Sequence, residues 1–447
     1  MDGSRTRLAF VAIALILTLL WFVSTPGDSW AGGFWPLRNA LVLYTGLMAI
    51  GFMSIAVILA ARPVQFEGLL GGLDKFYRLH KWLGVGATLF AIAHWLAETL
   101  PRTMVRRGWI TRPSRPPGGD TGSMSAAGFD PFTDLHDVAA EVAGLAYLLL
   151  LVLVVLALWR KFPYRHFFRV HRLLAPVYLV LVFHSVILMG PEYWRSPIGP
   201  VMGVLMAGGS IAAAISIFHR IGRARQAVGS IETLELYEDN AVLDVVVRLT
   251  TAWPGHRAGQ FAFVNFGGLE GAHPFTIASA WHRDGRLAFS IKGLGDYTRS
   301  LPEHLFPGQA VTIEGPYGRF DFRGARERQI WIGGGIGITP FIAGLQQLID
   351  EGRKGPVDLF YSTRAPSEPF IRNIRELADR AGVSFHLTVE QRDGFLTFDR
   401  IETTVPAWKE ADLWFCGPVR FADAIREPAM RRGLPPSQFH QELFEMR

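Results

Sequence analysis

The chain has 447 residues, a length that favours two to four domains, and 49% of its residues are hydrophobic. It carries 45 Lys and Arg against 39 Asp and Glu, a net charge of +6, but the basic residues of the first half gather between long apolar runs, so the charge indicates a membrane surface and not nucleic acid. The single cysteine, Cys416, excludes a disulfide within the chain.

Six apolar runs in the first half predict membrane spans, since each is near the length that crosses a hydrocarbon core of about 30 Å. They cover residues 8–23, 40–61, 82–100, 138–159, 173–189 and 198–218. An even number of spans returns the chain to its starting side, and most basic residues between the spans lie on that side, which the positive-inside rule makes cytoplasmic. We therefore expect a multi-pass protein of the plasma (inner) membrane with a cytoplasmic second half. Cleavage of the first run as a signal peptide would not invert the later spans.

Two of these runs carry histidines at similar spacing. His80 and His94 are 14 residues apart in the third run, which on a helix means roughly 21 Å along the axis and only about 40° of rotation. His171 and His184 are 13 residues apart in the fifth run, where an ideal helix would place them about 140° apart. Pro176 lies between them, and a helix kinked at a proline does not keep ideal phase.

Neutral imidazole is an axial ligand of haem iron, and two helices with histidines at matched depths can hold two bis-histidine haems. We therefore predict His80 with His171 at the inner level, and His94 with His184 at the outer level. The alternative is that each histidine is a polar residue satisfied by a neighbouring helix. Four histidines at matched depths favour the haem sites.

Two other histidines are weaker candidates. His166 is in phase with His184 but lies about 27 Å along the helix, so we keep it only as the alternative to His171. The Pro- and Gly-rich segment 101–135 predicts an irregular outer lid without a convincing metal-chelate site. His136, at the end of this lid, is expected to be a surface residue.

Beyond about residue 222 the pattern becomes that of a soluble protein. Short alternating strands in residues 229–322 predict a small antiparallel β-barrel. From residue 328, strands alternate with helices, which predicts a parallel sheet of nucleotide-binding type. The expected fold is thus a membrane all-α six-helix bundle in residues 1–222, an antiparallel β-barrel in 223–326 and an α/β parallel-sheet domain in 327–447.

A glycine cluster follows the first strand of the α/β domain in the sequence IWIGGGIGITP. Gly333, Gly335 and Gly337 would let backbone amides at a helix N-terminus approach a pyrophosphate. A tight strand-to-helix turn is the alternative. The motifs HPFTIAS at 273–279 and KGLGDYT at 292–298 precede the cluster and FCGP at 415–418 follows it, which favours dinucleotide binding.

The order HPFTIAS, KGLGDYT, GPYG, GGGIGITP and CGP resembles the flavin and nicotinamide half of the ferredoxin-reductase superfamily. With the histidine-bearing spans ahead of it, the chain resembles bacterial-type transmembrane NADPH oxidases and ferric reductases from about Lys75 to its end. The resemblance implies that the barrel binds FAD, that the α/β domain binds NAD(P)H and that the membrane half binds two b haems.

The resemblance also implies roles for individual residues. Phe275 and Thr276 would contact the flavin ring, His273 and Pro274 would shape its pocket, and Lys292 and Thr298 would hold the FAD pyrophosphate. Gly335, Gly337 and Thr339, with Gly333, would serve the dinucleotide phosphates, and Cys416, Gly417 and Pro418 would line the nicotinamide side. The alternative for Cys416 is a small buried hydrophobic residue.

Two further features bear on the nicotinamide. After the strand VDLFYS the chain offers Ser362 and Arg364 and no acidic residue until Glu368, which favours the 2′-phosphate of NADPH, with NADH as the alternative. In the family a terminal aromatic residue covers the flavin face that nicotinamide must reach, and Phe444 would be that gate. Packing at the end of the last strand is the alternative for Phe444.

These features predict electron transfer from cytosolic NADPH through FAD and two b haems to an acceptor on the outer side, where oxygen giving superoxide is our first choice. A ferric-chelate reductase with the same wiring is the alternative. A haem subunit that serves a protein or quinone partner is the second alternative, and the complete flavin and nicotinamide half argues against it. We expect membrane lipid around the spans, no nucleic acid and no obligatory protein partner.

Overall fold

The computed structural model describes residues 2–31, 33–63, 71–111, 130–159, 162, 164–268, 271–352 and 355–442. These residues form two compact units. The membrane unit is built from residues 5–63 and 76–221, and the soluble unit mainly from the described residues after 221. Each unit is described by itself. The predicted division into three domains at 222 and 326 stays a prediction.

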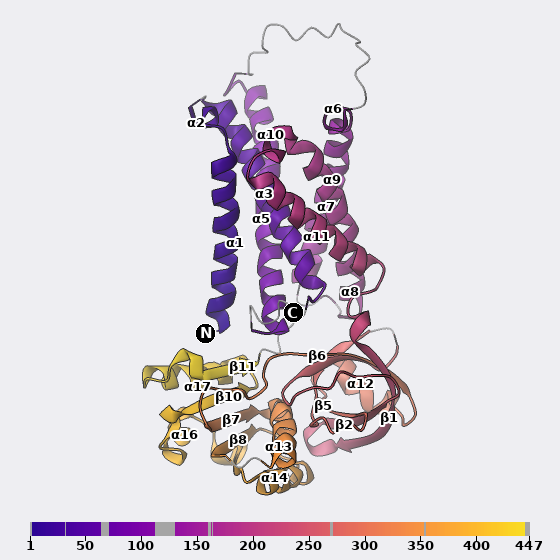
Figure 1. The fold of residues 1–447 in the computed structure, drawn as a ribbon, viewed down its shortest axis with the longest axis vertical. Coiled ribbons are helices and arrows are strands. Elements are labelled where there is room, and N and C mark those ends of the chain that lie inside the picture. Colours follow the sequence, from indigo (N-terminus) through magenta and orange to yellow (C-terminus); the bar gives the residue numbers. More distant parts are fainter. Residues whose placement is uncertain are drawn as a thin grey trace. The chain divides into compact units, whose positions relative to one another are not determined.

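The membrane unit contains six helical stretches that are long and apolar enough to cross a bilayer, so the prediction of six spans is confirmed. Its long helices form a bundle (Figure 1). They are α1 (Asp2–Ser24), α3 (Phe34–Ala60), α5 (Leu73–Arg106), α7 (His136–Leu158), α8 (Tyr164–Arg172) with α9 (Leu174–Leu188), and α11 (Ile198–Ile217). The short helices α2 (Asp28–Ala31), α6 (Pro131–Asp134) and α10 (Gly190–Trp194) also belong to the described part of this unit.

The fifth span is broken at the point that its proline dictates. Helix α8 ends at Arg172, and α9 begins at Leu174. Pro176 has no N–H to give to the carbonyl of Arg172, four residues earlier, so the helical ladder cannot continue through this turn. The break removes the ideal-helix phase between His171 and His184.

Small residues let the helices approach closely at the middle of the bundle. Helices α3, α5, α7 and α9 share one buried cluster, formed by Ala49, Ala91, Ala146, Leu150, Leu153 and Val177. Phe90 of α5 packs against this cluster, and its ring lies 5.7 Å from that of Phe52 and 5.8 Å from that of Tyr44. Both histidines of α5 are therefore carried on a helix whose centre is fixed by packing.

The soluble unit begins with the predicted antiparallel barrel. Six strands follow the order β4-β3-β6-β1-β2-β5, with every pairing antiparallel. A bridge between Ile277 and Phe289 joins the two edges of the sheet. The strands are β1 (Gln226–Tyr237), β2 (Val242–Leu249), β3 (Phe261–Asn265), β4 (His273–Thr276), β5 (Arg286–Lys292) and β6 (Ala310–Tyr317), and α12 (Asp296–His304) follows β5.

A five-stranded parallel sheet follows, in the order β11-β10-β7-β8-β9. Its strands are β7 (Arg328–Gly334), β8 (Val357–Thr363), β9 (Ser384–Val389), β10 (Ala411–Cys416) and β11 (Phe439–Glu442). The helices are α13 (Thr339–Glu351), α14 (Glu368–Ala381), α15 (Glu390–Asp393), α16 (Phe398–Thr404) and α17 (Val419–Arg431). Short 3-10 turns cover Arg223–Arg225, Glu238–Asn240, Gly335–Ile338, Trp408–Glu410 and Pro436–Gln438.

Alternation along the strands explains why helices cover both faces of the parallel sheet. Trp331 and Trp414 point into a core shared with α13 and α14, whereas Ile332 and Phe415 point into a core shared with α16 and α17. The strand order reverses between β7 and β10, and in open α/β sheets ligands bind outside the carboxyl ends of the strands at this point. The predicted fold class is confirmed for all three parts.

Candidate functional site

The structure brings the four predicted metal ligands together as two pairs. His80 of α5 faces His171 of α8, with ring centroids 5.8 Å apart and planes at 69°. His94 of α5 faces His184 of α9, with centroids 6.2 Å apart and planes at 85°. Helix α5 is continuous between its two histidines, so the two pairs lie roughly 21 Å apart along it.

The spacing within each pair fits one metal ion between two imidazoles. A metal–imidazole bond is about 2 Å, and the ring centre lies about 1 Å further on, so two imidazoles on opposite sides of one metal have centroids about 6 Å apart. Both pairs match this distance. The four histidines would therefore hold two six-coordinate haems, one at each level.

Backbone carbonyls orient three of the four imidazoles. Nδ1 of His80 donates to the carbonyl of Ala56 at 2.8 Å, and Nδ1 of His94 donates to that of Val42 at 2.8 Å. Nδ1 of His184 donates to the carbonyl of Ala139 in α7 at 3.1 Å. A ring nitrogen that donates in this way leaves the lone pair on Nε2, where it can bind a metal.

Two further neighbours contact the imidazole rings, Phe167 beside His171 and Gly46 beside His94. His171 stacks on Phe167, with centroids 5.1 Å apart and planes at 14°, and its buried Nδ1 has no hydrogen-bond partner among the described residues. Gly46 leaves room for His94, because a Cβ there would lie 3.2 Å from the imidazole. The stacking of Phe167 and the room at Gly46 help to set the orientation of these two rings.

The two alternative histidines lie elsewhere. His166 has an exposed side chain, and His136 is also exposed, 3.3 Å from the carboxylate of Asp137. The geometry therefore favours His171 over His166 as the partner of His80, as the sequence analysis does. The assignment of ligands itself stays a prediction.

The predicted flavin residues lie on one short edge strand, β4. The hydroxyl of Thr276 is buried and has no hydrogen-bond partner among the described residues, which is the state expected of a group that a bound ring would satisfy. Phe275 is half-buried on the same strand, beside Pro274. The chemistry of this edge fits a flavin.

His273 opens β4 and lies flat against Tyr297, with ring centroids 3.9 Å apart. Burial lowers the pKa of His273 to about 4, so its imidazole is neutral at physiological pH. It can shape the flavin pocket, as predicted, but it does not supply a positive charge to a phosphate.

Thr298 and Lys292 flank the turn between β5 and α12. The Oγ1 atom of Thr298 accepts hydrogen bonds from the backbone N–H groups of Leu294 and Gly295, at 3.0 and 3.1 Å, and so closes the first turn of α12. Lys292 is the last residue of β5. Thr298 thus shapes the loop whose backbone would meet the pyrophosphate, while Lys292 is the cation at that end.

The glycine cluster divides into packing and open positions. A Cβ on Gly337 would lie 2.2 Å from the carbonyl oxygen of Cys416, so this glycine lets two backbones touch. A Cβ on Gly333 would lie 3.0 Å from the side chain of Ile338. Gly335 has φ +56 and would meet no described atom within 4 Å, which makes it the glycine open to a ligand.

The rest of the cluster lies around this turn. Thr339 is buried, and its hydroxyl donates to the carbonyl of Ile336 at 2.7 Å at the start of α13. Gly417 and Pro418 follow β10, and a Cβ on Gly417 would lie 3.1 Å from Gly334. These residues bring the ends of β7 and β10 together at the switch point.

Cys416 is fully buried at the end of β10, and burial raises the pKa of its thiol well above the usual value. The side chain therefore stays a neutral thiol, and the alternative of a small buried hydrophobic residue remains open. The predicted gate, Phe444, lies outside the described residues.

Sequence reasoning missed Glu442, which pairs in register with Cys416 where β11 ends beside β10. Its Oε2 atom is buried without a hydrogen-bond partner among the described residues, and burial raises the pKa of the carboxyl to about 8. Glu442 is therefore mostly protonated at neutral pH. Only the strand order reveals it, because its sequence context, FHQELFEMR, carries no recognisable motif.

At the carboxyl end of β8, Ser362 is buried and Arg364 is exposed. The guanidinium of Arg364 forms an ion pair with Glu390, Nε to Oε2 at 3.1 Å. The registered pair Thr363 and Val389 places the two strand ends side by side. An acidic group thus stands where the sequence around Arg364 offers none, and it would compete with a 2′-phosphate for the arginine.

Comparisons with known proteins agree with this division. Residues 45–182 match the family described as the ferric reductase like transmembrane component, and residues 227–321 match an FAD-binding domain. The first match includes three of the four paired histidines, His80, His94 and His171, and ends two residues before His184. The second includes the barrel from the second residue of β1 onward. The chain therefore joins a ferric reductase-like membrane domain to an FAD-binding oxidoreductase domain, which confirms the family resemblance of its motifs.

Several relatives are reductases. The chain is 31% identical over 205 residues to the reductase subunit Stc4 of stachydrine N-demethylase from Rhizobium meliloti (strain 1021), and 25% identical over 196 residues to the electron transfer component of toluate 1,2-dioxygenase from Pseudomonas putida. Each match covers 42% of this chain and 58% of the relative's length. A solved structure of the ferredoxin reductase in carbazole 1,9a-dioxygenase aligns with 49% of this chain and 69% of its own, at 22% identity and a TM-score of 0.42.

We predict that His94→Ala and His184→Ala will each lower the haem content from two haems per FAD to one, because bis-histidine ligation fails when either partner is lost. The flavin should still be reduced by NADPH. His136→Ala, which changes an exposed histidine near the same end of the bundle, is the matched control and should keep both haems. Two low-spin haems in either ligand variant, measured by optical redox titration, would refute the assignment.

We further predict that Arg364→Ala will lower kcat/KM for NADPH about 10- to 100-fold relative to NADH, the range expected when a charge-assisted contact to a phosphate is lost. Glu390→Gln should shift the preference the opposite way, because it frees the guanidinium for the 2′-phosphate. Steady-state rates of flavin reduction with both nucleotides measure this. An unchanged preference in Arg364→Ala would show that the arginine does not contact the nucleotide.

Proposed function

We propose that the protein transfers electrons from cytosolic NADPH, through FAD and two b haems, to oxygen at the outer face of the membrane, where superoxide forms. The observation that carries this proposal is the two histidine pairs, which lie at two levels of the continuous helix α5. The ring centroids are 5.8 Å apart in one pair and 6.2 Å apart in the other. A ferric reductase-like membrane domain joined to an FAD-binding domain supports transmembrane electron transfer.

Nicotinamide supplies a two-electron hydride, flavin exchanges pairs for single electrons, and haem carries one electron at a time. Residues of this chain offer a site for each carrier in this order, first nucleotide, then flavin, then the two haems. The turn around Gly335 and the ends of β7 and β10 would receive the nucleotide, and the β4 edge with Thr276 would orient the flavin. The histidine couples would then fix two positions roughly 21 Å apart along α5.

The orientation of the protein is part of the proposal. Basic residues between the spans favour the cytoplasm for the soluble unit, by the positive-inside rule. With the interior of the cell negative, moving one electron outward is favoured by about 2.3 kcal/mol per 100 mV. The membrane potential would therefore assist transfer toward the outer pair.

A ferric-chelate reductase is the second candidate, and the match of residues 45–182 to the ferric reductase like transmembrane component favours it specifically. Two histidines would hold each haem for either acceptor, and neither acceptor would have to bind the metal. The same route from NADPH through FAD and two haems would therefore serve oxygen and a ferric chelate, and turnover measurements distinguish the two acceptors.

The deciding experiment measures NADPH-driven turnover in proteoliposomes. We expect dye reduction in air that superoxide dismutase suppresses, at a rate well above that of His94→Ala, which controls for superoxide released directly by flavin. Anaerobic reduction of a ferric chelate is measured in parallel. Chelate reduction that is fast and unaffected by oxygen would contradict superoxide formation and establish the second candidate.

A further inference from the structure

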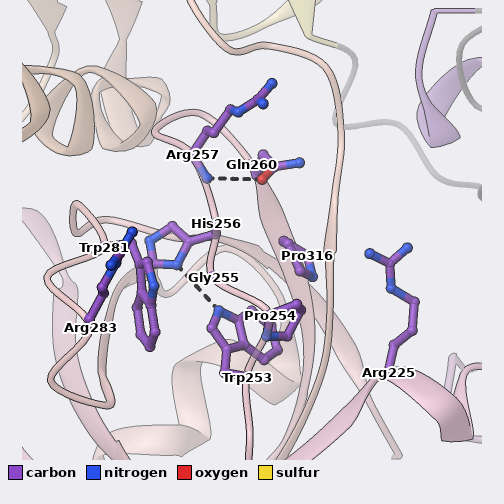
Figure 2. A pocket seen from close by; sticks show the side chains of 10 residues that line it. All are labelled: Arg225, Trp253, Pro254, Gly255, His256, Arg257, Gln260, Trp281, Arg283 and Pro316. Carbon is purple, nitrogen blue, oxygen red and sulfur yellow. Dashed lines mark hydrogen bonds between the residues drawn. The ribbon is translucent and has the colours of Figure 1, made fainter.

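A basic and aromatic pocket lies at one end of the barrel, away from the predicted pyrophosphate loop. Its volume is about 730 Å³, within the usual range for small-molecule sites. The residues that line it are Arg225, Trp253, Pro254, Gly255, His256, Arg257, Gln260, Trp281, Arg283 and Pro316. Figure 2 shows Arg225 and Arg283 on opposite sides of the aromatic residues.

The position of the pocket separates it from the predicted FAD-binding loop. Strand β5 starts at Arg286, three residues after Arg283, and ends at Lys292. At about 3.3 Å per residue, the two ends of this strand lie roughly 20 Å apart. The pocket and the loop 292–298 therefore occupy opposite ends of the barrel.

Three aromatic residues in contact with one another, Trp253, His256 and Trp281, line one side of the pocket. Nε1 of Trp253 donates to Nδ1 of His256 at 3.4 Å, and Nε2 of His256 donates to the carbonyl of Ser279 at 2.8 Å. The ring of His256 also lies 5.6 Å from that of Trp281. Burial lowers the pKa of His256 to about 4, so this histidine acts as a neutral link that fixes both indoles.

Gly255 lets the loop that carries Trp253 and His256 pass close to Trp281. Gly255 has φ +84, and a Cβ there would lie 2.9 Å from Nε1 of Trp281. Only glycine readily combines this backbone conformation with so close an approach. The indole edge of Trp281 is thereby held at the pocket surface.

The charged side chains that line the pocket are basic. Its described lining contains three arginines and no acidic side chain. Arg257 lies 3.5 Å from Asp321 and is partly neutralised, while Arg225 lies over the ring of Tyr317 at 5.4 Å. Arg283, exposed and at φ +60, has no ion-pair partner among the described residues. Guanidinium groups bind phosphate through paired N–H donors.

We propose that this pocket binds an anionic ligand that carries a phosphate group, with Arg225 and Arg283 attracting its negative charge from two sides and Trp253 and Trp281 packing against the group that carries the phosphate. Phosphate of this kind is presented both by anionic phospholipids, which surround a multi-pass membrane protein, and by soluble nucleotides. This site is additional to the FAD and nicotinamide sites, and it does not depend on which acceptor the enzyme reduces.

The test uses the full-length, FAD-loaded protein in detergent, with isothermal titration calorimetry. The probes are dioctanoyl phosphatidic acid, ATP and inorganic pyrophosphate, with zwitterionic dioctanoyl phosphatidylcholine as the neutral comparison. We expect saturable binding of at least one phosphate probe in the unaltered protein. Binding of phosphatidic acid alone identifies a lipid as the source, and binding of ATP or pyrophosphate alone identifies a soluble phosphate.

The double variant Arg225→Gln with Arg283→Gln should weaken binding of the phosphate probe at least tenfold, since both positive charges are lost. Arg225→Lys with Arg283→Lys retains the charge and should bind measurably better than the Gln pair. Arg372→Gln, at an exposed position of α14, is the matched control and should bind as the unaltered protein does. FAD content should be the same in all of them.

Three results would overturn the proposal. One is the absence of saturable binding for every phosphate probe, and another is equal affinity in the Gln pair and the unaltered protein. The third is loss of FAD from both the Gln and the Lys pairs, which would show that the pocket belongs to the flavin site.

Discussion

The separation between two imidazole rings is the constraint on which the membrane half depends. A pair of histidines can share one metal only if four helices hold their backbones at fixed distances, and the buried alanines of α3, α5 and α7 make that packing possible. Carbonyls of Ala56, Val42 and Ala139 then set the ring orientation, so α3 and α7 position predicted ligands that they do not themselves carry. The interruption at Leu173 serves the same end, because it frees His171 from the phase of α9.

In the soluble unit the equivalent constraint is close backbone approach at the switch point. Gly337 and Gly417 let the ends of β7 and β10 touch, and this contact leaves Gly335 as the open position of the turn. Glycines of the same motif therefore have different roles: some allow close backbone contact, and one leaves space for a ligand. The same region gathers a buried thiol and a buried carboxyl, Cys416 and Glu442, in one register where the strands end.

Much of this could be predicted from the sequence, and the rest depends on contacts between distant segments. Hydropathy gave the six spans, and alternation gave the barrel and the parallel sheet, because both signals are local. Matched spacing and the proline pointed to the pairing of His80 with His171. The ion-pair partner of Arg364 could not be predicted, because Glu390 lies 26 residues away in the sequence and only the pairing of β8 with β9 brings it close. Glu442 and the arginine pocket were hidden for the same reason, because strand order and loop closure assemble them.

The central claim is that each histidine pair binds one haem, and haem stoichiometry with spin state tests it most directly. Purified protein would be assayed for haem by the pyridine haemochrome method and for extracted FAD, and its oxidised form would be examined by low-temperature electron paramagnetic resonance. The account predicts two b haems per FAD, both low-spin, as six-coordinate bis-histidine ligation requires. One haem or none per FAD, or a high-spin signal from a five-coordinate haem, would contradict it.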